Sequence, residues 1–416
     1  MSHIALSGKR VLELGGWIAA PYAGIVLAHL GAEVIKVEGL AGDPTRTLVR
    51  GGPGGTFIAY NHDKKSVCID LGSSSGRAVF EKLLKTADVV VHNLSPDAAR
   101  NLRVTIRDCH AVNPNVVFCH ITGYGPGPRE DDVATNPIAE AASGVMYANR
   151  VNGRPTRLGP SHHDVFAGMN AVIGILAALA PNDGNTRNRR VNVGLYETAL
   201  HIAARDLVGV TLSDQVPRKD RASKASEFGQ PGYGAYQTAD NRWVYLVILS
   251  DSHWQQFCKV MKLPQHDDPT LSTRRQRRAR SDELEALVAA TVKSHSFEVC
   301  TELLKSSGLG FSEVMRYRDV LNDPQAQYPG KFSLLPFLGH EYPIVDSPIL
   351  SEIPSKGSQT PPPLLGQHTE QIVRSLGYDS KEYGELVLAK AVASPDDPNR
   401  AVADLGDPNH SPDQSQ

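Results

Sequence analysis

The amino-acid sequence predicts an α/β protein with a large Rossmann-like domain and a second, smaller α+β domain. Short apolar runs alternate with amphipathic helical patterns through the first half of the chain. These runs are continuously apolar, which is typical of strands in a parallel sheet that helices cover on both faces. Beyond residue 213 the sequence becomes polar, and a hairpin pattern followed by helices replaces the alternation. With 416 residues, the chain is long enough for two or three domains.

The elements of the large domain follow from this alternation. Helical segments show a period near 3.6 residues, whereas strands are short apolar runs between turn-forming residues. The segment 165–180 is almost wholly apolar and contains Gly168 and Gly174, so we expect a helix that is buried on all sides. The predicted strands are 10–14, 33–37, 66–70, 88–91, 115–119 and 189–194, and the other predicted helices are 21–30, 75–85 and 195–212.

Changes in composition set the predicted domain boundaries. Residues 1–213 form the first part of the large domain, and the polar, glycine-containing segment 214–234 suits a linker with a mobile loop. Residues 235–325 form the small domain, and 326–392 return to the large one. The tail, 393–416, is rich in Asp, Pro, Asn and Ser and is expected to be disordered. The small domain is predicted to contain strands at 234–238 and 242–249 and helices at 252–262, 281–293 and 297–306.

Composition argues against several classes of partner. Lys and Arg total 43 against 45 Asp and Glu, so no surface-wide charge attracts nucleic acid or an acidic membrane. No uncharged apolar run approaches the roughly 18 residues that a membrane span needs. The five cysteines show no CxxC pairing, which indicates reduced thiols. We therefore expect a cytoplasmic globular protein without nucleic-acid or membrane partners, and we interpret the basic run 274–280 as a solvated approach to a helix.

Common cofactor and metal motifs do not fit. Gly15 and Gly16 follow the first strand, but a dinucleotide-binding GxGxxG would also need glycines where Trp17 and Ala20 stand. No HExxH appears, and the adjacent histidines at 162 and 163 would point in opposite directions on an extended segment. No GxSxG is present. We therefore expect no metal site and no resident cofactor.

The segment around Asp164 is the most informative part of the sequence. Asp164 lies just before the long apolar helix, after the Gly159-Pro160 turn. One interpretation is an N-cap, in which the carboxylate accepts hydrogen bonds from the first helical turn. The other is a nucleophile, because a helix N-terminus favours an ionised carboxylate even in a partly dry site. The residues alone leave both interpretations open.

Several segments together resemble the class III CoA-transferase family of the CaiB/BaiF type, which includes formyl-CoA transferase and the related α-methylacyl-CoA racemases. The resemblance covers roughly residues 5–392 and preserves the order of its pieces. No single piece is diagnostic, but the number of pieces in order is specific. The main matching segments are Val11–Leu14, Ala20–Gly24, Leu30–Glu38, Gly42–Arg46, Asp164–Gly168, Gly229–Gly232 and Pro361–Gly366.

The resemblance implies a reaction and an assembly. By similarity to the family, Asp164 is the nucleophile, which forms a mixed anhydride with the acyl group and then an aspartyl-CoA thioester. The implied substrates are an acyl-CoA donor and a carboxylic acid acceptor, and coenzyme A enters as a substrate rather than as a cofactor. The family also implies a homodimer of interlocked, ring-shaped subunits, which nothing in the composition indicates.

The resemblance further implies residues that contact CoA. These are the backbone at Gly16, Trp17, Ile18 and Ala19, the corner at Asn93 and Leu94, and Lys64, Lys65 and Arg100 for the phosphates. Arg100 or Arg103 would replace basic residues that the family has where Ser95 and Asn101 stand here. Gly229, Gln230 and Gly232 resemble a lid over the aspartyl intermediates. A surface lysine pair and an ordinary turn are the plainer interpretations of Lys64-Lys65 and of the glycine loop.

Two alternative functions stay open. A racemase on the same scaffold would need a histidine where Thr135 stands, and a threonine does not exchange protons near neutral pH. A catalytically inactive CoA-binding homologue would explain Trp17 and the missing basic residues. Trp17 and Ile18 would narrow and dry the mouth of the pocket, which favours an acyl group less polar than formyl or oxalyl. An equal interpretation is that Trp17 only packs against the pantetheine arm of CoA.

Overall fold

The computed structural model describes residues 5–49, 52–180, 189–212, 230–349 and 360–395. The chain divides into two compact units, each made of separate stretches of sequence. The first unit comprises residues 1–147, 157–213 and 328–416, and the second comprises 148–156 and 214–327. Most of the linker predicted at 214–234 and most of the tail predicted at 393–416 lie outside the described residues.

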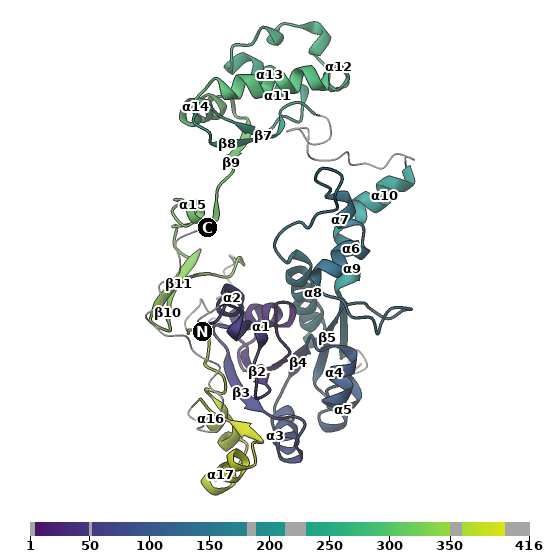
Figure 1. The fold of residues 1–416 in the computed structure, drawn as a ribbon, viewed down its shortest axis with the longest axis vertical. Coiled ribbons are helices and arrows are strands. Elements are labelled where there is room, and N and C mark those ends of the chain that lie inside the picture. Colours follow the sequence, from purple (N-terminus) through teal and green to yellow (C-terminus); the bar gives the residue numbers. More distant parts are fainter. Residues whose placement is uncertain (1–4, 50–51, 181–188, 213–229, 350–359, 396–416) are drawn as a thin grey trace. The chain divides into compact units, whose positions relative to one another are not determined.

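The first unit contains a seven-stranded, mostly parallel sheet, which confirms the α/β prediction (Figure 1). Six strands are parallel in the order β3-β2-β1-β4-β5-β6, and β12 adds an antiparallel edge beside β3. The strand order reverses at the β1–β4 pair, where Leu12 of β1 lies between Ile35 and Val90. The strands are β1 Arg10–Leu14, β2 Glu33–Glu38, β3 Lys65–Ile69, β4 Val89–His92, β5 Val117–Thr122, β6 Arg190–Gly194 and β12 Val392–Ala393.

Helices cover both faces of this sheet, as the continuously apolar strands predict. Val11 packs in one apolar cluster with α1, α8 and α9, whereas its neighbour Leu12 packs in another with α3, α5, α16 and α17. A separate hairpin of β10 (Phe332–Phe337) and β11 (His340–Val345) belongs to the same unit. The helices are α1 Ala19–His29, α2 Gly55–Asn61, α3 Ser74–Leu84, α4 Pro96–Asn101, α5 Ile106–Val112, α6 Asn136–Ala142, α7 Val145–Ala148, α8 His162–Leu179, α9 Leu195–Ile202, α10 Ala204–Leu212, α16 Thr369–Ser375 and α17 Ser380–Leu388, with a 3₁₀ turn η1 at Pro44–Thr47.

Helix α8 packs closely on α1 and on the sheet, but one of its faces is bare. A Cβ atom on Gly168 would lie 2.8 Å from the Ala19 carbonyl oxygen, so glycine permits the close crossing with α1. The opposite face exposes large apolar side chains, and the prediction of a helix buried on all sides is therefore wrong for this chain. By length and composition α8 could cross a membrane, but it packs on β5 and β6, which identifies it as a helix of the sheet unit. The exposed side chains are Phe166, Met169, Ile173 and Leu176.

Two other helix predictions also need correction. Helix α8 begins at His162, so that Asp164 is its third residue and does not precede the helix. The helix predicted at 195–212 is two helices, α9 and α10, separated at Ala203. The remaining predicted helices and strands of this unit occur with ends shifted by a few residues.

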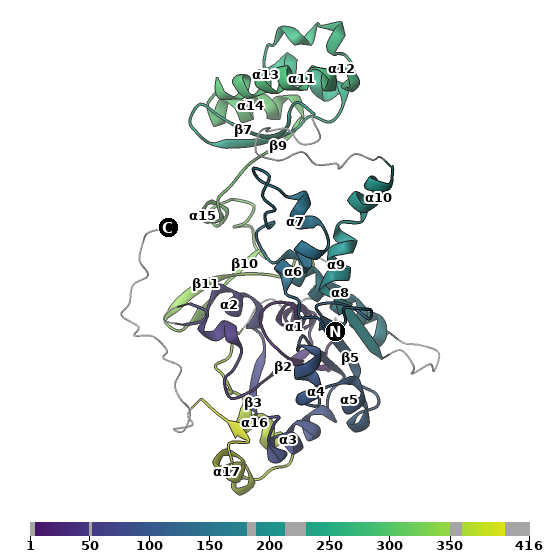
Figure 2. The ribbon, with the colours of Figure 1, turned by 45° about the vertical axis from the view of Figure 1, so that its right-hand side comes forward.

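The second unit is a three-stranded antiparallel sheet, β7-β8-β9, on which helices pack around Trp254 and Phe257 (Figure 2). The basic run includes α12, and its Arg277 is fully buried with its guanidinium paired to Asp251. The run is therefore not solvated throughout. The elements are β7 Tyr233–Gln237, β8 Trp243–Val247, α11 Asp251–Val260, α12 Arg274–Ala279, α13 Ser281–Lys293, α14 Phe297–Ser307, β9 Gly310–Glu313 and α15 Tyr317–Val320, with 3₁₀ turns η4 at Pro264–His266 and η5 at Pro269–Leu271.

Candidate functional site

The turn after β1 lies at the point where the strand order reverses, which in open α/β sheets is the usual place for a ligand. The structure brings two predicted residues together here. The Gly16 N–H donates to the Asn93 side-chain oxygen over 3.2 Å, and the Asn93 amide donates back to the Gly16 carbonyl over 2.8 Å. Gly15 has a φ of +99°, and a Cβ atom there would lie 2.1 Å from the Asn93 oxygen. Asn93 therefore fixes this turn.

Trp17 continues the turn in a left-handed conformation. Its φ is +63°, which costs an ordinary L-residue about 1–2 kcal/mol. The indole is 54% exposed, whereas Ile18 is half-buried and Ala19 is buried at the start of α1. Ile18 stands at the N-cap position without a side-chain hydrogen bond to the helix. The turn thus presents a large aromatic ring beside the uncapped N-terminus of α1.

Asp164 lies in the first turn of α8, and another residue satisfies the helix amides. The Asn136 side-chain oxygen accepts from the N–H of His163 over 2.9 Å and from that of Asp164 over 3.4 Å. Ser161 occupies the N-cap position and makes no side-chain cap hydrogen bond. The N-cap interpretation of Asp164 is therefore wrong, because Asn136 supplies the cap.

The carboxyl group of Asp164 is held in a partly dry environment. Burial raises its pKa to about 6, and the positive charge of Arg157 opposes this increase. Arg157 is itself paired with the buried Glu140, at 3.4 Å. Within the described ranges no hydrogen bond reaches the Asp164 carboxylate, so its oxygens are open to an incoming group. At neutral pH the group is largely ionised but only weakly stabilised.

Two tyrosines lie near this carboxylate. The charge of Asp164 contributes to raising the pKa of Tyr60, after the larger effect of burial, and the Tyr60 ring lies 5.5 Å from that of Tyr22 in α1. Gly168 stands one helical turn beyond Asp164 on the same side of α8, and it contacts the first turns of α1. The start of α8 therefore lies beside the start of α1, where the Trp17 turn ends.

The lysines predicted to bind phosphate do not fit that role. Lys64 is buried, and its ammonium contacts the Glu13 carboxylate at 2.6 Å and the Pro21 carbonyl at 2.8 Å. Burial lowers the Lys64 pKa to about 8, with Glu13 opposing the decrease. Lys65 pairs at 2.6 Å with Glu33, the first residue of β2, at the amino end of that strand. The physical reason for this correction is that ion pairs within the protein engage the ammonium groups of both Lys64 and Lys65.

Leu94 and Arg100 follow the Asn93 corner along the chain. Arg100 is exposed and pairs with Asp97 at 2.5 Å and with Asp131 at 3.2 Å. The same arginine lines a cavity of about 300 Å³ between α4 and the strands β5 and β6, and Asp164 does not line this cavity. The Leu94 carbonyl contacts His120 Nε2 at 2.9 Å. Arg100 is thus engaged with two acids, and its contact with a CoA phosphate stays a prediction.

The described part of the predicted lid packs within the second unit. Gln230 is buried, and its side-chain oxygen accepts from Arg274 over 3.0 Å. Gly232 has a φ of +79°, and its N–H donates to the Tyr236 hydroxyl over 2.9 Å. A Cβ atom on Gly232 would lie 2.4 Å from the Ile248 side chain. Gly232 is therefore required by a tight turn, and Gly229 lies outside the described residues.

One cluster has the composition of a metal site. The potential ligand atoms of His29, His62 and Asp63 lie within 4.8 Å of one another. However, His62 Nδ1 is 3.0 Å from the Asp63 carboxylate, which also accepts hydrogen bonds from Thr360. These contacts account for the proximity of His62 and Asp63 without an ion. The expectation of no metal remains a prediction.

Residues 6–369 match the protein family described as CoA-transferase family III. This chain belongs to CoA-transferase family III. The match covers both units and confirms the resemblance proposed from the sequence. The family III CoA-transferases are enzymes, so the chain is an enzyme of this class, and the carboxylate at the start of α8 belongs to a transferase.

Two curated relatives illustrate the similarity. The chain is 30% identical to the human succinyl-CoA:glutarate CoA-transferase over 412 residues, which covers 93% of this chain and 90% of the relative. It is 27% identical to the (R)-2-hydroxy-4-methylpentanoate CoA-transferase of Clostridioides difficile over 405 residues, covering 93% and 99%. A crystal structure of a CaiB/BaiF family protein from Brucella suis superposes with a TM-score of 0.77 at 25% identity, covering 89% of this chain and 98% of the other.

Sequence reasoning missed Asn136 and the tyrosine pair. Asn136 is separated from Asp164 by a long loop and two short helices, and only the fold brings its amide to the start of α8. The Asn136-Pro137 pair does mark a helix start in the sequence, because proline favours the first helical turn. Tyr22 and Tyr60 carry no sequence signal that relates them to Asp164.

Proposed function

We propose that this CoA-transferase moves CoA from an acyl-CoA donor to a carboxylic acid through covalent intermediates on Asp164. The observation that carries the proposal is the carboxylate in the first turn of α8, partly buried and without a hydrogen-bond partner among the described residues. A buried carboxylate with a pKa of about 6 is ionised at neutral pH and is a better nucleophile than a solvated one.

The reaction then consists of four substitutions at carbonyl carbon. An Asp164 oxygen attacks the donor thioester, the carbon–sulfur bond breaks, and CoA leaves as the thiolate from a mixed anhydride. The thiolate attacks the Asp164 carbonyl carbon, which gives an aspartyl-CoA thioester and releases the donor acid. The acceptor carboxylate attacks this thioester and expels the thiolate to form a second anhydride. The thiolate finally attacks the acceptor acyl carbon, which forms the new acyl-CoA and regenerates Asp164. No general base is needed because every nucleophile is already an anion.

Negative charge that develops on the carbonyl oxygens needs pre-positioned donors. The His163 and Asp164 N–H groups already bond to the Asn136 oxygen, so these two helix amides are not free to serve as such donors. The Asn136 side-chain amide nitrogen is buried and has no partner in the part of the chain that the structure describes. We assign this nitrogen as a donor to the oxyanion or to the bound acyl group.

The transferase is favoured over the two alternatives. The relatives are CoA-transferases, and the racemase position holds the exposed Thr135. An inactive homologue would not need a carboxylate that burial makes reactive. The acyl group is proposed to be less polar than formyl or oxalyl because the exposed Trp17 indole stands at the turn. Rates with a panel of mono- and dicarboxylic acids as acceptors test this preference.

We also propose that the enzyme is an interlocked homodimer. The bare face of α8 exposes side chains at residues 166, 169, 173 and 176, a spacing that places them on one stripe of the helix. Helix α10 also exposes apolar residues, and its Leu212 is 81% exposed. An exposed apolar stripe such as that of α8 marks a protein interface. Sedimentation at micromolar concentration is expected to give twice the chain mass, and Ile173→Asp is expected to reduce that species. All five cysteines lie in the described part of the chain, and none is in a disulfide, which fits the proposed cytoplasmic location.

The covalent step has a direct test. The enzyme is incubated with acyl-CoA without acceptor, treated with hydroxylamine, digested and analysed by mass spectrometry. A hydroxamate at residue 164 is expected in the wild type and none in Asp164→Asn, which has the same size but is a poor nucleophile. Modification at another carboxylate would contradict the proposal, as would solvent exchange of the substrate α-proton, which indicates a racemase.

A further inference from the structure

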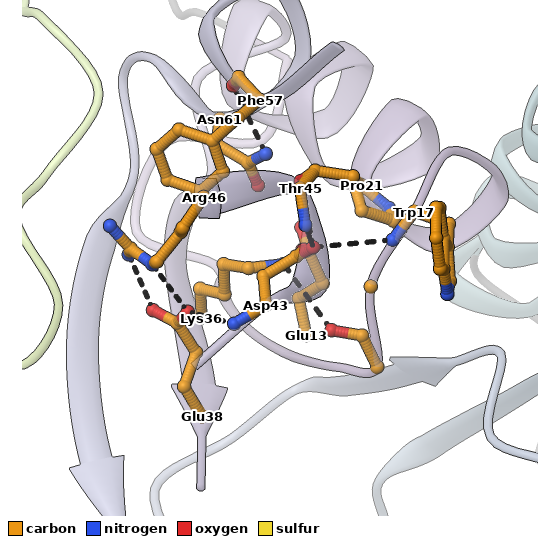
Figure 3. Close-up of polar contacts among 12 residues, drawn as sticks. Glu13, Trp17, Pro21, Lys36, Glu38, Asp43, Thr45, Arg46, Phe57 and Asn61 are labelled. Carbon is orange, nitrogen blue, oxygen red and sulfur yellow. Dashed lines mark hydrogen bonds and ion pairs between the residues drawn. The ribbon is translucent and has the colours of Figure 1, made fainter. Parts of the chain in front are cut away.

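The backbone of the turn at residues 15–18 is hydrogen-bonded to two buried, charged side chains. The Trp17 N–H donates to an Asp43 carboxylate oxygen over 3.4 Å, and the Lys36 ammonium donates to the Gly15 carbonyl over 3.4 Å. Together with Asn93, these contacts give the two peptide groups between residues 15 and 17, on the N-terminal side of the left-handed residue, hydrogen-bond partners. Figure 3 shows the Trp17 backbone facing Asp43 while its indole points away.

Asp43 is held in place by several contacts. One of its carboxylate oxygens accepts from the N–H of Thr45 over 2.8 Å and from its hydroxyl over 2.7 Å, and the other pairs with Lys36 at 2.9 Å. A Cβ atom on Gly16 would lie 2.9 Å from the Asp43 carboxyl carbon, so the turn rests directly on this group. A shift of Asp43 would therefore be transmitted to the turn.

Lys36 anchors Asp43 within a buried, charge-balanced cluster. Its side chain is completely buried and also contacts Glu13 at 2.9 Å. Burial alone would lower the Lys36 pKa, but the neighbouring carboxylates outweigh burial and raise the pKa above its ordinary value. Lys36 is thus a permanent cation. The cluster has three carboxylates, Glu13, Glu38 and Asp43, and three cations, Lys36, Arg46 and Lys64.

We propose that Lys36 and Asp43 are positioning residues, which hold the Trp17 turn in the conformation that receives acyl-CoA. The inference rests on the proposed function, in which this turn contacts CoA. Neither residue touches the substrate: both are buried beneath the turn. They act through the backbone of residues 15–17.

The physical reason is the backbone strain at Trp17. A bulky L-residue prefers a negative φ, so it keeps a φ of +63° only where its surroundings impose it. Loss of the Asp43 contact would let residue 17 relax, which would rotate the indole and displace the adjoining amides at the start of α1. Substrate binding would weaken, whereas the chemistry at Asp164 would proceed once substrate is bound.

The second unit contains a matched control. Asp268-Pro269-Thr270 repeats the Asp43-Pro44-Thr45 sequence, and Asp268 likewise accepts from the Thr270 N–H over 2.8 Å and from its hydroxyl over 2.6 Å. Both aspartates cap a 3₁₀ turn. Asp268 differs in its cation partner, which is the partly exposed Arg280 at 3.6 Å. Replacement of either aspartate by asparagine keeps an oxygen that can accept the cap hydrogen bonds and removes the negative charge. Only at residue 43 is the cation partner completely buried, so there the asparagine amide group would face the Lys36 ammonium and the side chain would turn away from the Trp17 N–H.

The test compares steady-state kinetics of Asp43→Asn and Asp268→Asn with the wild type. For Asp43→Asn we expect the KM for acyl-CoA to rise about tenfold, with kcat and the KM for the acceptor acid within about twofold. For Asp268→Asn we expect all three constants within about twofold. An unchanged acyl-CoA KM in Asp43→Asn, or an equal change in both variants, would overturn the inference. If Asp43→Asn does not fold, Asp43→Glu keeps the charge opposite Lys36 and is expected to raise the same KM.

A glycine at position 17 separates positioning from general destabilisation. Glycine adopts a positive φ without strain, so Trp17→Gly removes the need for the restraint. Adding Asp43→Asn to Trp17→Gly should change the acyl-CoA KM less than twofold, whereas adding it to Trp17→Ala should change it about tenfold. Equal effects in both backgrounds would contradict the inference. Failure of the proposed function is recognised separately, because wild-type enzyme would then give no hydroxamate at residue 164.

Discussion

Asp164 and Asp43 are two aspartates of the same unit, and their environments change their acidity in opposite directions. Burial raises the pKa of Asp164 to about 6, with Arg157 as the opposing charge. Burial also acts to raise the pKa of Asp43, but Lys36 and Thr45 outweigh it and leave the pKa below its ordinary value. The difference lies in close partners: Asp43 is surrounded by donors, whereas Asp164 is left open. A carboxylate whose oxygens accept hydrogen bonds within the protein stabilises the fold, whereas one whose oxygens are unbonded can react with a substrate.

Replacement of Asp164 gives the largest expected effect on activity. Asp164→Ala removes the proposed nucleophile, so the rate of CoA transfer should fall about 1,000-fold or more while CoA still binds. Chromatography of the acyl-CoA products measures the rate, and calorimetry measures CoA binding. Retention of transfer at a tenth of the wild-type rate or more would contradict the nucleophilic role.

Removal of the cation beside Asp43 should reduce stability strongly. Lys36→Met leaves Glu13 and Asp43 without a shared cation in a buried site, and breaking such a pair costs about 3–5 kcal/mol. Urea unfolding measures the loss. Lys65→Met is the control, because the Lys65–Glu33 pair is partly exposed and should contribute less than about 1 kcal/mol. Similar decreases in the free energy of unfolding of the two variants would show that the buried ion pairs of Lys36 contribute no more to stability than the partly exposed pair of Lys65.

The raised pKa of Asp164 predicts the pH dependence of adduct formation. The nucleophile is the ionised form, so the rate should increase about tenfold per pH unit below pH 6 and level off above it. Arg157→Met removes a charge that lowers this pKa, so the midpoint should move to higher pH. Quench-flow measurements of the aspartyl adduct between pH 4.5 and 8 give the midpoint. A midpoint that moves to lower pH in Arg157→Met would contradict a stabilising effect of the Arg157 charge on the Asp164 carboxylate.

The smallest expected effect is on thermal stability, and its sign distinguishes the two aspartates. The folded-state pKa of Asp164 exceeds its unfolded value, so between about pH 4 and 6 the native state binds more protons and stability falls as pH rises. Asp164→Asn should therefore stabilise the protein at pH 7.5 by up to about 2 kcal/mol, with no gain below pH 4. The pKa of Asp43 is lower in the folded than in the unfolded protein, so the ionised group stabilises the fold above its unfolded pKa. That stabilisation is lost as the pH falls through the folded-state pKa. Asp43→Asn should therefore destabilise the protein at pH 7.5. Calorimetric melting of both variants at the two pH values tests the signs.

Local sequence pattern was sufficient for most of the elements. The apolar runs correspond to β1 to β6 because parallel strands are buried on both faces, and the helix at 281–293 has the predicted ends. Nothing in the local sequence marks the break at Ala203 between α9 and α10. The apolar face of α8 was taken for buried surface because a sequence does not show whether its own chain covers that face.

The site depended on contacts between distant residues, which a local pattern does not contain. The sequence placed Asp164 near a helix start, but the helix begins earlier because the Asn136 oxygen accepts from its first amides. The position of Lys64 in a charged, polar segment suggested a surface cation, whereas Glu13 on the central strand draws its ammonium inside. The backbone strain at Trp17 and its hydrogen bond to Asp43 could not be predicted from the sequence, because they depend on how closely two loops approach each other in the fold.

The antiparallel edge strand has a consequence for synthesis on the ribosome. Ala393 pairs with Cys68 and Val392 with Ile69, so β3 emerges from the exit tunnel long before its edge partner has been translated. During that interval β3 has an unsatisfied edge, which invites pairing with other nascent chains. The strands β7, β8 and β9 all lie between residues 233 and 313 and complete their sheet earlier. The first unit, although its strands β1 to β6 are translated first, is therefore the unit whose sheet is completed last.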